Sequence, residues 1–254
     1  MTESLVHFHE FNLKKSDLGS MTKEEIAVLG MLSYICNELN VFARFLRLTE
    51  RQDDERGPVK FASDLQFHVV LRTLSSRVFE AYEFLKEATK KTEKLDPEML
   101  ALIQKSTEEI ERLGASEGHA INRNIRNETS FHYKLNTALK NAGSLPCDAD
   151  ASVYVNSLDG NTYFVLGESL VFFERLRRFS AADKKFEDPE ILAESWIKWS
   201  LEVVMLIKDL QANLFGIVLD RAKKVPRKTH YFVKSEVVAK DKRAVMPVFI
   251  QSDQ

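Results

Sequence analysis

Long stretches in which apolar residues recur every three or four positions are separated along this chain by short polar breaks. The first stretch lies between Thr22 and Thr49, and its spacing places the apolar side chains on one face of a helix. Thr22 and Glu25 have the spacing of a capping box, which predicts that this helix starts there. The same periodicity predicts further helices over residues 63–92, 98–113, 118–139, 167–179 and 189–224.

Polar segments mark where these helices end. The run RQDDERGP (residues 51–58) predicts a loop after the first helix. Asp96 can cap the helix that follows it, with Pro97 at the first helical position, and Gly114 is expected to stop that helix. Residues 152–166 change to the pattern of a strand pair, SVYV and TYFVL on either side of a turn at Asp159-Gly160.

These elements predict an all-α fold: an elongated up-down bundle of about six helices with a small β-hairpin insertion. We expect an N-terminal arm (residues 1–21) that contains a short extended piece near residues 5–11. A helical domain (22–224) with the hairpin at 152–166 and a basic C-terminal tail (225–254) would follow, and the tail could contribute short strands. Trp196 and Trp199 lie three residues apart on an apolar helix and are expected to be core residues.

Candidate chemistry concentrates in the segment 118–139, GHAINRNIRNETSFHYKLNTAL, which is predicted to be one helix. Arg126, Asn127, His132 and Tyr133 lie at its centre. An arginine can hold a phosphate through a forked contact, and a histidine can carry a proton at cellular pH. The buried positions of this helix are expected to be Ile121, Ile125, Phe131, Leu135 and Leu139.

An arginine, a polar residue and then a histidine, here Arg126, Asn127 and His132, resemble the motif of the HEPN superfamily. The resemblance extends loosely over residues 22–220 and implies an all-helical dimer that cleaves RNA without a metal ion. In such a reaction a ribose 2′-hydroxyl attacks the adjacent phosphate and the 5′-oxygen departs. The resemblance implies that His132 transfers a proton, that Arg126 stabilises the transition state and that Asn127 orients the histidine or a phosphate oxygen. Tyr133 and Arg123 are expected to contact the RNA.

Helix geometry supports a site that two chains share. Six residues separate Arg126 from His132, which is about 9 Å of rise and about 240° of rotation, so the two side chains do not stack on one helix face. A full acid and base pair also needs two proton carriers. A two-fold homodimer would supply a second Arg126 and a second His132.

These residues also have other interpretations. Arg112 and His119 have a similar spacing, but Leu113 is not polar and Gly114 and Gly118 interrupt the helix between the two ends. His132 also lies four residues after Glu128, which is an ordinary pair on a helix surface. The protein could therefore be a HEPN-like RNA-binding, nucleotide-binding or scaffold protein without cleavage activity, or an unrelated helical interaction protein.

Charge is distributed unevenly. The net charge is −2, which argues against bulk electrostatic coating of nucleic acid, yet residues 221–243 hold nine basic and two acidic residues, a net of +7. Within this basic segment, residues 223–234 (KKVPRKTHYFVK) mix cations with His230, Tyr231 and Phe232, a composition that could grip a phosphate backbone while stacking a base. It also matches a solvated tail. The candidate binding residues there are Lys223, Lys224, Arg227 and Lys228.

Composition excludes several classes of protein. Cys36 and Cys147 lie in unrelated contexts, so neither a disulfide framework nor a zinc site is predicted. His7 and His9 alternate beside Glu10, but no further ligand lies near in sequence, so no metal and no cofactor are expected. No signal sequence and no run of about 20 uninterrupted apolar residues occurs. We expect a cytoplasmic toxin or phage-defence protein, with RNA as substrate and a cognate antitoxin or nucleotidyltransferase as a further partner.

Overall fold

The structure is a computed structural model that describes residues 3–49, 57–90, 94–114, 117–125, 135–157, 161–173, 189–234, 246–247 and 249. The α-helices in these ranges are α1 (Lys23–Leu48), α2 (Gly57–Lys90), α3 (Pro97–Gly114), α4 (Glu117–Ile125), α5 (Leu135–Ala142), α6 (Val165–Glu168) and α8 (Pro189–Arg221). The short turns are the 3-10 turn η1 (Lys15–Leu18) and the π-helical turn η5 (Ser169–Phe173). The strands are β1 (Glu3–Glu10), β2 (Val153–Tyr154), β3 (Tyr163–Phe164) and β4 (Arg227–Lys234).

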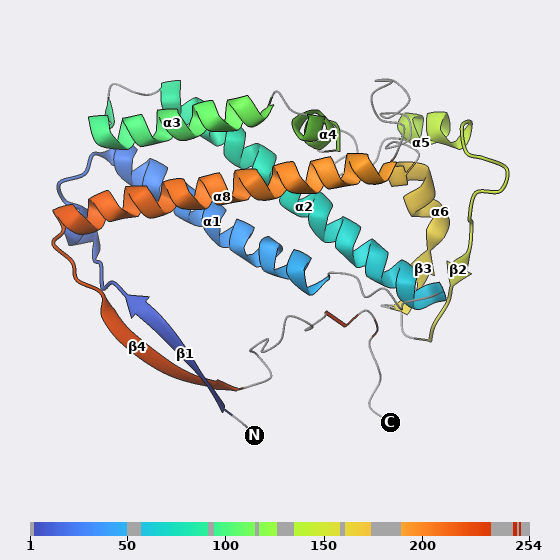
Figure 1. The fold of residues 1–254 in the computed structure, drawn as a ribbon, viewed down its shortest axis with the longest axis horizontal. Coiled ribbons are helices and arrows are strands. Elements are labelled where there is room, and N and C mark those ends of the chain that lie inside the picture. Colours follow the sequence, from blue (N-terminus) through green and yellow to red (C-terminus); the bar gives the residue numbers. More distant parts are fainter. Residues whose placement is uncertain are drawn as a thin grey trace.

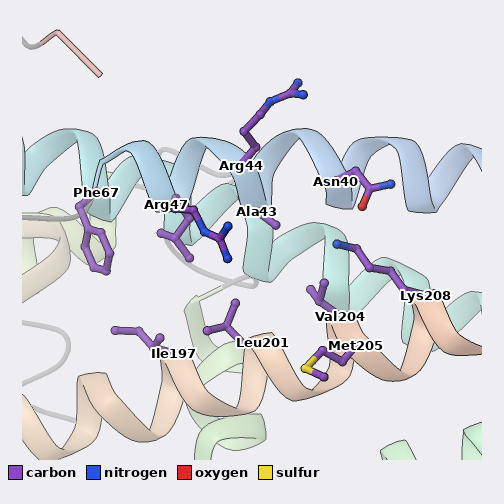
Figure 2. A pocket seen from close by; sticks show the side chains of 11 residues that line it. Asn40, Ala43, Arg44, Arg47, Phe67, Ile197, Leu201, Val204, Met205 and Lys208 are labelled. Carbon is purple, nitrogen blue, oxygen red and sulfur yellow. The ribbon is translucent and has the colours of Figure 1, made fainter. Parts of the chain in front are cut away.

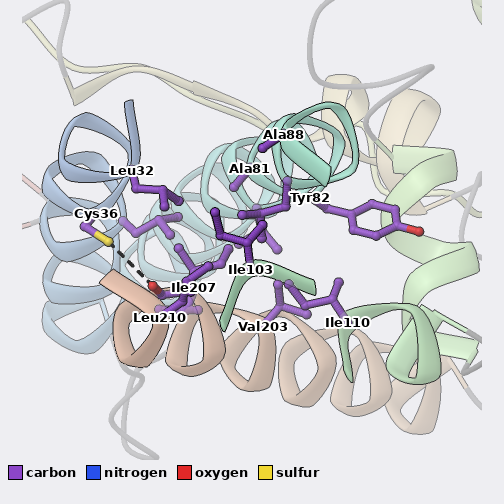
Figure 3. Packing of buried hydrophobic residues seen from close by; sticks show 14 of the residues in the cluster. Leu32, Cys36, Ala81, Tyr82, Ala88, Ile103, Ile110, Val203, Ile207 and Leu210 are labelled. Atoms are coloured by element: carbon purple, nitrogen blue, oxygen red, sulfur yellow. Dashed lines mark hydrogen bonds between the residues drawn. The ribbon is translucent and has the colours of Figure 1, made fainter. Parts of the chain in front are cut away.

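The fold is all-α and elongated, with a small β-hairpin, which confirms the prediction (Figure 1). Helix α8 runs along the length of the molecule, and α1, α2, α3 and α4 pack against it. The four longest helices contribute the core, in which leucine, isoleucine and valine side chains interdigitate (Figure 3). Leu32, Leu39, Val203 and Ile207 are fully buried there. Trp196 and Trp199 are core residues, as predicted.

The start of α1 forms as the sequence predicts. The Thr22 hydroxyl accepts a hydrogen bond from the Glu25 backbone N–H, and the Glu25 carboxylate accepts one from the Thr22 N–H at 2.7 Å. The same buried carboxylate accepts a second backbone hydrogen bond, from Asp96 at 2.8 Å. Asp96 in turn caps α3, as expected. Glu25 therefore joins the N-terminal ends of two helices through backbone groups.

Helix α2 begins earlier than predicted. It starts at Gly57 rather than near residue 63, and Pro58 lies in its first turn. A proline is tolerated there because the first backbone N–H groups of a helix have no intrahelical partner. Residues 51–56 of the predicted loop lie outside the described part of the chain.

Two small β-structures accompany the helices. Strands β2 and β3 form the predicted antiparallel hairpin, but Val165 and Leu166 of the predicted second arm belong to α6. Tyr154 and Tyr163 of the hairpin contact the ring of Phe61 on α2. Strands β1 and β4 form a second antiparallel pair over eight residues each, which joins the predicted arm to the predicted tail (Figure 1). We call this pair the terminal ribbon. The sequence had suggested both extended segments but not their pairing.

Helix α1 is also the one helix among the described residues whose length and mean hydropathy would allow it to cross a membrane. Its inner face packs against α2 and α8 in this structure. Helices that belong to a protein core can meet the same criterion of length and composition.

Candidate functional site around helix α4

Helix α4 ends at Ile125, the residue immediately before Arg126. It approaches α8 so closely that a Cβ atom at Gly118 would lie 2.6 Å from the backbone oxygen of Ser195 and would also clash with Trp199. Glycine is therefore required at position 118 for the two helix backbones to meet. Trp199 of α8 also donates a hydrogen bond from its indole N–H to the carbonyl of Leu113 in α3 at 3.1 Å, just before α4 begins. The segment that leads into the motif is thus held against the longest core helices.

His119 lies in a cage of aromatic rings. Its imidazole stacks on Phe79 with ring centroids 6.3 Å apart, meets Tyr82 edge-on at 5.8 Å and contacts Trp199 at 5.4 Å. Burial lowers the pKa of His119, and the positive charge of Arg123 lowers it further, while a hydrogen bond with the Gly114 backbone acts in the opposite direction. The surroundings therefore favour the neutral form of the ring.

Two polar groups on α4 are buried without a partner among the described residues. They are Nε2 of His119 and both side-chain polar atoms of Asn122, which is fully buried. An unsatisfied buried polar group costs about 1–3 kcal/mol, so such groups normally find a partner. Asn122 precedes Arg126 by four residues. Buried polar atoms with no partner among the described residues therefore lie one helical turn before the first residue of the motif.

Arg126, Asn127, His132 and Tyr133 lie outside the described residues, so their predicted arrangement stays a prediction. Arg123 is on the exposed side of the last turn of α4. The chain is described again from α5 onwards. The predicted single helix over 118–139 is thus represented by α4 and α5, with residues 126–134 between them undescribed.

Helix α5 departs from the predicted burial pattern. Ile121 on α4 is buried as expected, but Leu135 and Leu139 on α5 are 73% and 61% exposed. They lie one turn apart and form an apolar stripe on the surface of the chain. Helix α5 is held instead through Asn141, which donates a hydrogen bond to the Leu170 carbonyl at 2.7 Å. The prediction that these leucines are buried within one chain is wrong, because α5 turns the opposite side towards η5.

The candidate basic residues surround the junction between α8 and β4. Lys223 adopts a left-handed backbone conformation just after α8, with φ of 50°. Lys224 forms an ion pair with Asp17 at 3.0 Å. Arg227 and Lys228 are consecutive in β4, so their side chains point to opposite faces of the ribbon. Arg227 and Lys228 therefore do not share one face of the ribbon.

The periodicity of the sequence did not predict the surface that the terminal ribbon forms. Alternation places Leu5, His7 and His9 of β1 on the same face as Lys228, His230, Phe232 and Lys234 of β4. Nδ1 atoms of His7 and His230 are 2.6 Å apart across the strands. Phe232 is 69% exposed. The available signal was the alternation of His7, Phe8 and His9 in the first segment and the mixture of cations with aromatic residues in the second.

No group of three or more histidine, cysteine or acidic side chains in the described part of the chain could hold a metal ion. Comparison of the chain with protein-family models, with curated proteins and with solved structures gave no match.

The His119 cage leads to a prediction about acid stability. Because the pKa of His119 is lower in the folded state than its ordinary value of 6.5, its neutral form favours folding in full above that pH. This contribution is lost as the pH falls from 6.5 towards the folded-state pKa. We expect His119→Phe to lose less stability than the unaltered protein between pH 7 and pH 5, measured from urea unfolding at each pH.

Tyr82→Phe is the matched control, because it alters the same cage and leaves the imidazole in place. It should retain the acid sensitivity of the unaltered protein. An equal loss of stability in His119→Phe and the unaltered protein would show that the cage does not hold a neutral histidine.

Proposed function

We propose that this protein is a metal-independent endoribonuclease of the HEPN type. It acts in the cytoplasm, as a toxin or phage-defence component, at a composite site formed by two chains. The observation that carries the proposal is the sequence Arg126-Asn127 with His132, which follows directly on a helix that is held against the core. Arg126 would stabilise the charge that develops on the phosphate, and His132 would transfer a proton.

The surroundings of α4 support a polar site at this position. Helix α4 packs closely against α8 at Gly118, and the motif directly follows α4 in the sequence. Catalytic groups need a rigid support of this kind to keep their positions. The amide of Asn122 and Nε2 of His119 have no hydrogen-bond partner among the described residues, so a polar segment of the chain or an internal water molecule could satisfy these buried atoms.

The apolar stripe on α5 supports the two-chain arrangement. Leu135 and Leu139 follow the motif closely in sequence and are exposed in the single chain. Apolar stripes of this kind are commonly covered in protein interfaces. A two-fold contact through α5 would bring the residues that follow each motif together, so each chain would supply one Arg126 and one His132.

The proposal is tested with purified protein and end-labelled single-stranded RNA in the presence of EDTA. Cleavage should proceed and leave a 2′,3′-cyclic phosphate and a 5′-hydroxyl, because the attacking group is the ribose 2′-oxygen. The solution mass should be that of a dimer. Intact RNA after incubation with a dimeric protein would contradict the cleavage proposal, and a monomer would contradict the composite site.

The terminal ribbon favours a second function, RNA binding without cleavage. Phe232 offers an exposed ring for base stacking, and Lys228 and Lys234 flank it on the same face. Stacking of one base on an aromatic side chain contributes about 1–3 kcal/mol to binding. A HEPN-like protein of this kind would bind RNA or nucleotides or serve as a scaffold, with a cognate antitoxin or nucleotidyltransferase as its partner.

Phe232→Ala is therefore expected to weaken binding of a single-stranded RNA by about 1–3 kcal/mol, as measured by fluorescence anisotropy. Phe164→Ala is the control, because Phe164 is a similarly exposed phenylalanine on the other β-pair. Equal affinities of the two variants would exclude the ribbon as the RNA-binding surface. A protein that neither cleaves nor binds RNA would instead be a helical interaction protein.

A further inference from the structure

A groove of about 900 Å³ lies between the second half of α1 and the middle of α8, with α2 closing one end (Figure 2). Its apolar lining is formed by Leu46, Phe67, Ile197, Leu201, Val204 and Met205. Sequence periodicity predicted core helices here and did not indicate that they would separate. Figure 1 shows α1 crossing α8 and then separating from it towards the C-terminal end of α1, where the residues that line the groove lie.

The apolar lining reaches the protein surface. Met205 is 64% exposed and Leu201 is 39% exposed, although both lie in the middle of the core helix α8. Their spacing is one helical turn, so they form a row with Ile197 along the side of the groove that α8 forms. We call the α1 and α8 sides of the groove its two banks. Contiguous exposed apolar side chains of this kind mark binding surfaces in soluble proteins.

Cations extend over this apolar surface from both banks. Figure 2 shows the Arg47 guanidinium reaching into the gap from α1 and the Lys208 amine reaching over it from α8. Neither forms an ion pair with another described residue, and none of the described residues that line the groove is acidic. An occupant that presents carboxylates on two sides would complement both charges.

We infer that this groove binds an acidic amphipathic helix of a partner protein. The α8 bank from Ile197 to Lys208 spans about 16 Å, which matches about three helical turns of a ligand. Leucines at every third or fourth position of that helix would contact the apolar floor, and flanking glutamates would meet Arg47 and Lys208. The groove residues are distinct from the motif, so this inference does not depend on the proposed cleavage activity.

An acyl chain with one anionic head group fits these features less well. Such a ligand carries its charge at one end, whereas the cations here lie on opposite banks. Small apolar ligands are also usually enclosed on most sides, whereas this groove is open along its outer side. The experiment distinguishes the two occupants.

The probe is a fluorescein-labelled helical peptide of about 15 residues, with leucines at helical spacing and glutamates on both flanks. A second peptide replaces each glutamate with lysine. Fluorescence anisotropy with the full-length protein should show saturable binding of the acidic peptide and at least about tenfold weaker binding of the basic one. Failure of the acidic peptide to bind, or equal binding of both peptides, would overturn the inference. Binding of oleate by a protein that does not bind the acidic peptide would overturn it as well.

Variants locate the binding surface. The double variant Arg47→Glu with Lys208→Glu should weaken the acidic peptide by about tenfold or more and improve binding of the basic peptide. Met205→Asp should abolish binding of both peptides. The matched control is Lys105→Glu with Arg112→Glu, which makes the same charge change at exposed positions of α3. Circular dichroism melting verifies that each variant is folded. Equal weakening by the groove and α3 variants would contradict a docking site in the groove.

Discussion

The substitution His132→Ala is expected to slow RNA cleavage by about 10²- to 10⁴-fold, which is the usual contribution of a positioned proton carrier. The change removes the imidazole that would transfer a proton to or from the reacting oxygens. RNA affinity should change little, because the imidazole acts in the chemical step and the phosphate contacts remain. Single-turnover cleavage of labelled RNA in EDTA measures the first quantity, and gel retardation measures the second.

Arg112→Ala is the matched control for this experiment. Arg112 lies in the last turn of α3 and forms the other arginine and histidine spacing in the chain, with His119. It should cleave RNA at the rate of the unaltered protein, whereas Arg126→Ala should be slowed as His132→Ala is. If His132→Ala retained full activity while Arg112→Ala lost it, the site would have to be reassigned to the end of α3 and His119.

Gly118→Ala is expected to destabilise the folded protein by about 1–3 kcal/mol, although alanine is the better helix former. The added methyl group meets the backbone oxygen of Ser195 at 2.6 Å, and a backbone atom of a core helix cannot move away cheaply. Helix α4 must therefore shift away from α8. The urea midpoint of unfolding measures the loss. We also expect slower RNA cleavage, because the motif begins at the end of the displaced helix.

Gly216→Ala serves as the control because a Cβ atom at Gly216, within α8, meets nothing within 4 Å. It should stabilise the protein by roughly 0.5–1 kcal/mol through helix propensity alone. An increase in stability for both variants would show that α4 is not held against α8 at Gly118.

Local signals predicted most of the helices. The capping box at Thr22 and Glu25 and the cap at Asp96 place the starts of α1 and α3, because these side chains bond backbone groups only a few residues away. The same local reasoning misplaced the start of α2. Gly57 and Pro58 are typical of a loop, yet Gly57 begins the helix with a left-handed φ of 55° and Pro58 is compatible with the first helical turn.

Burial on α5 could not be predicted in the same way. The spacing of Leu135 and Leu139 indicates one apolar face, and the prediction assumed that this face meets the core. In the structure the hydrogen bond of Asn141 to Leu170 lies on the side that packs, and the leucines are exposed. Periodicity identifies a helix face and does not identify what covers it.

The sequence by itself determined the helical class, most helix boundaries and the arginine and histidine motif, because these depend on interactions between residues close together in the chain. Only the tertiary structure decided that β1 pairs with β4, that α4 meets α8 at Gly118 and that α1 and α8 diverge into a groove. Those features bring together segments that are far apart in sequence. Their relative positions follow from the packing of whole helices, which no local pattern specifies.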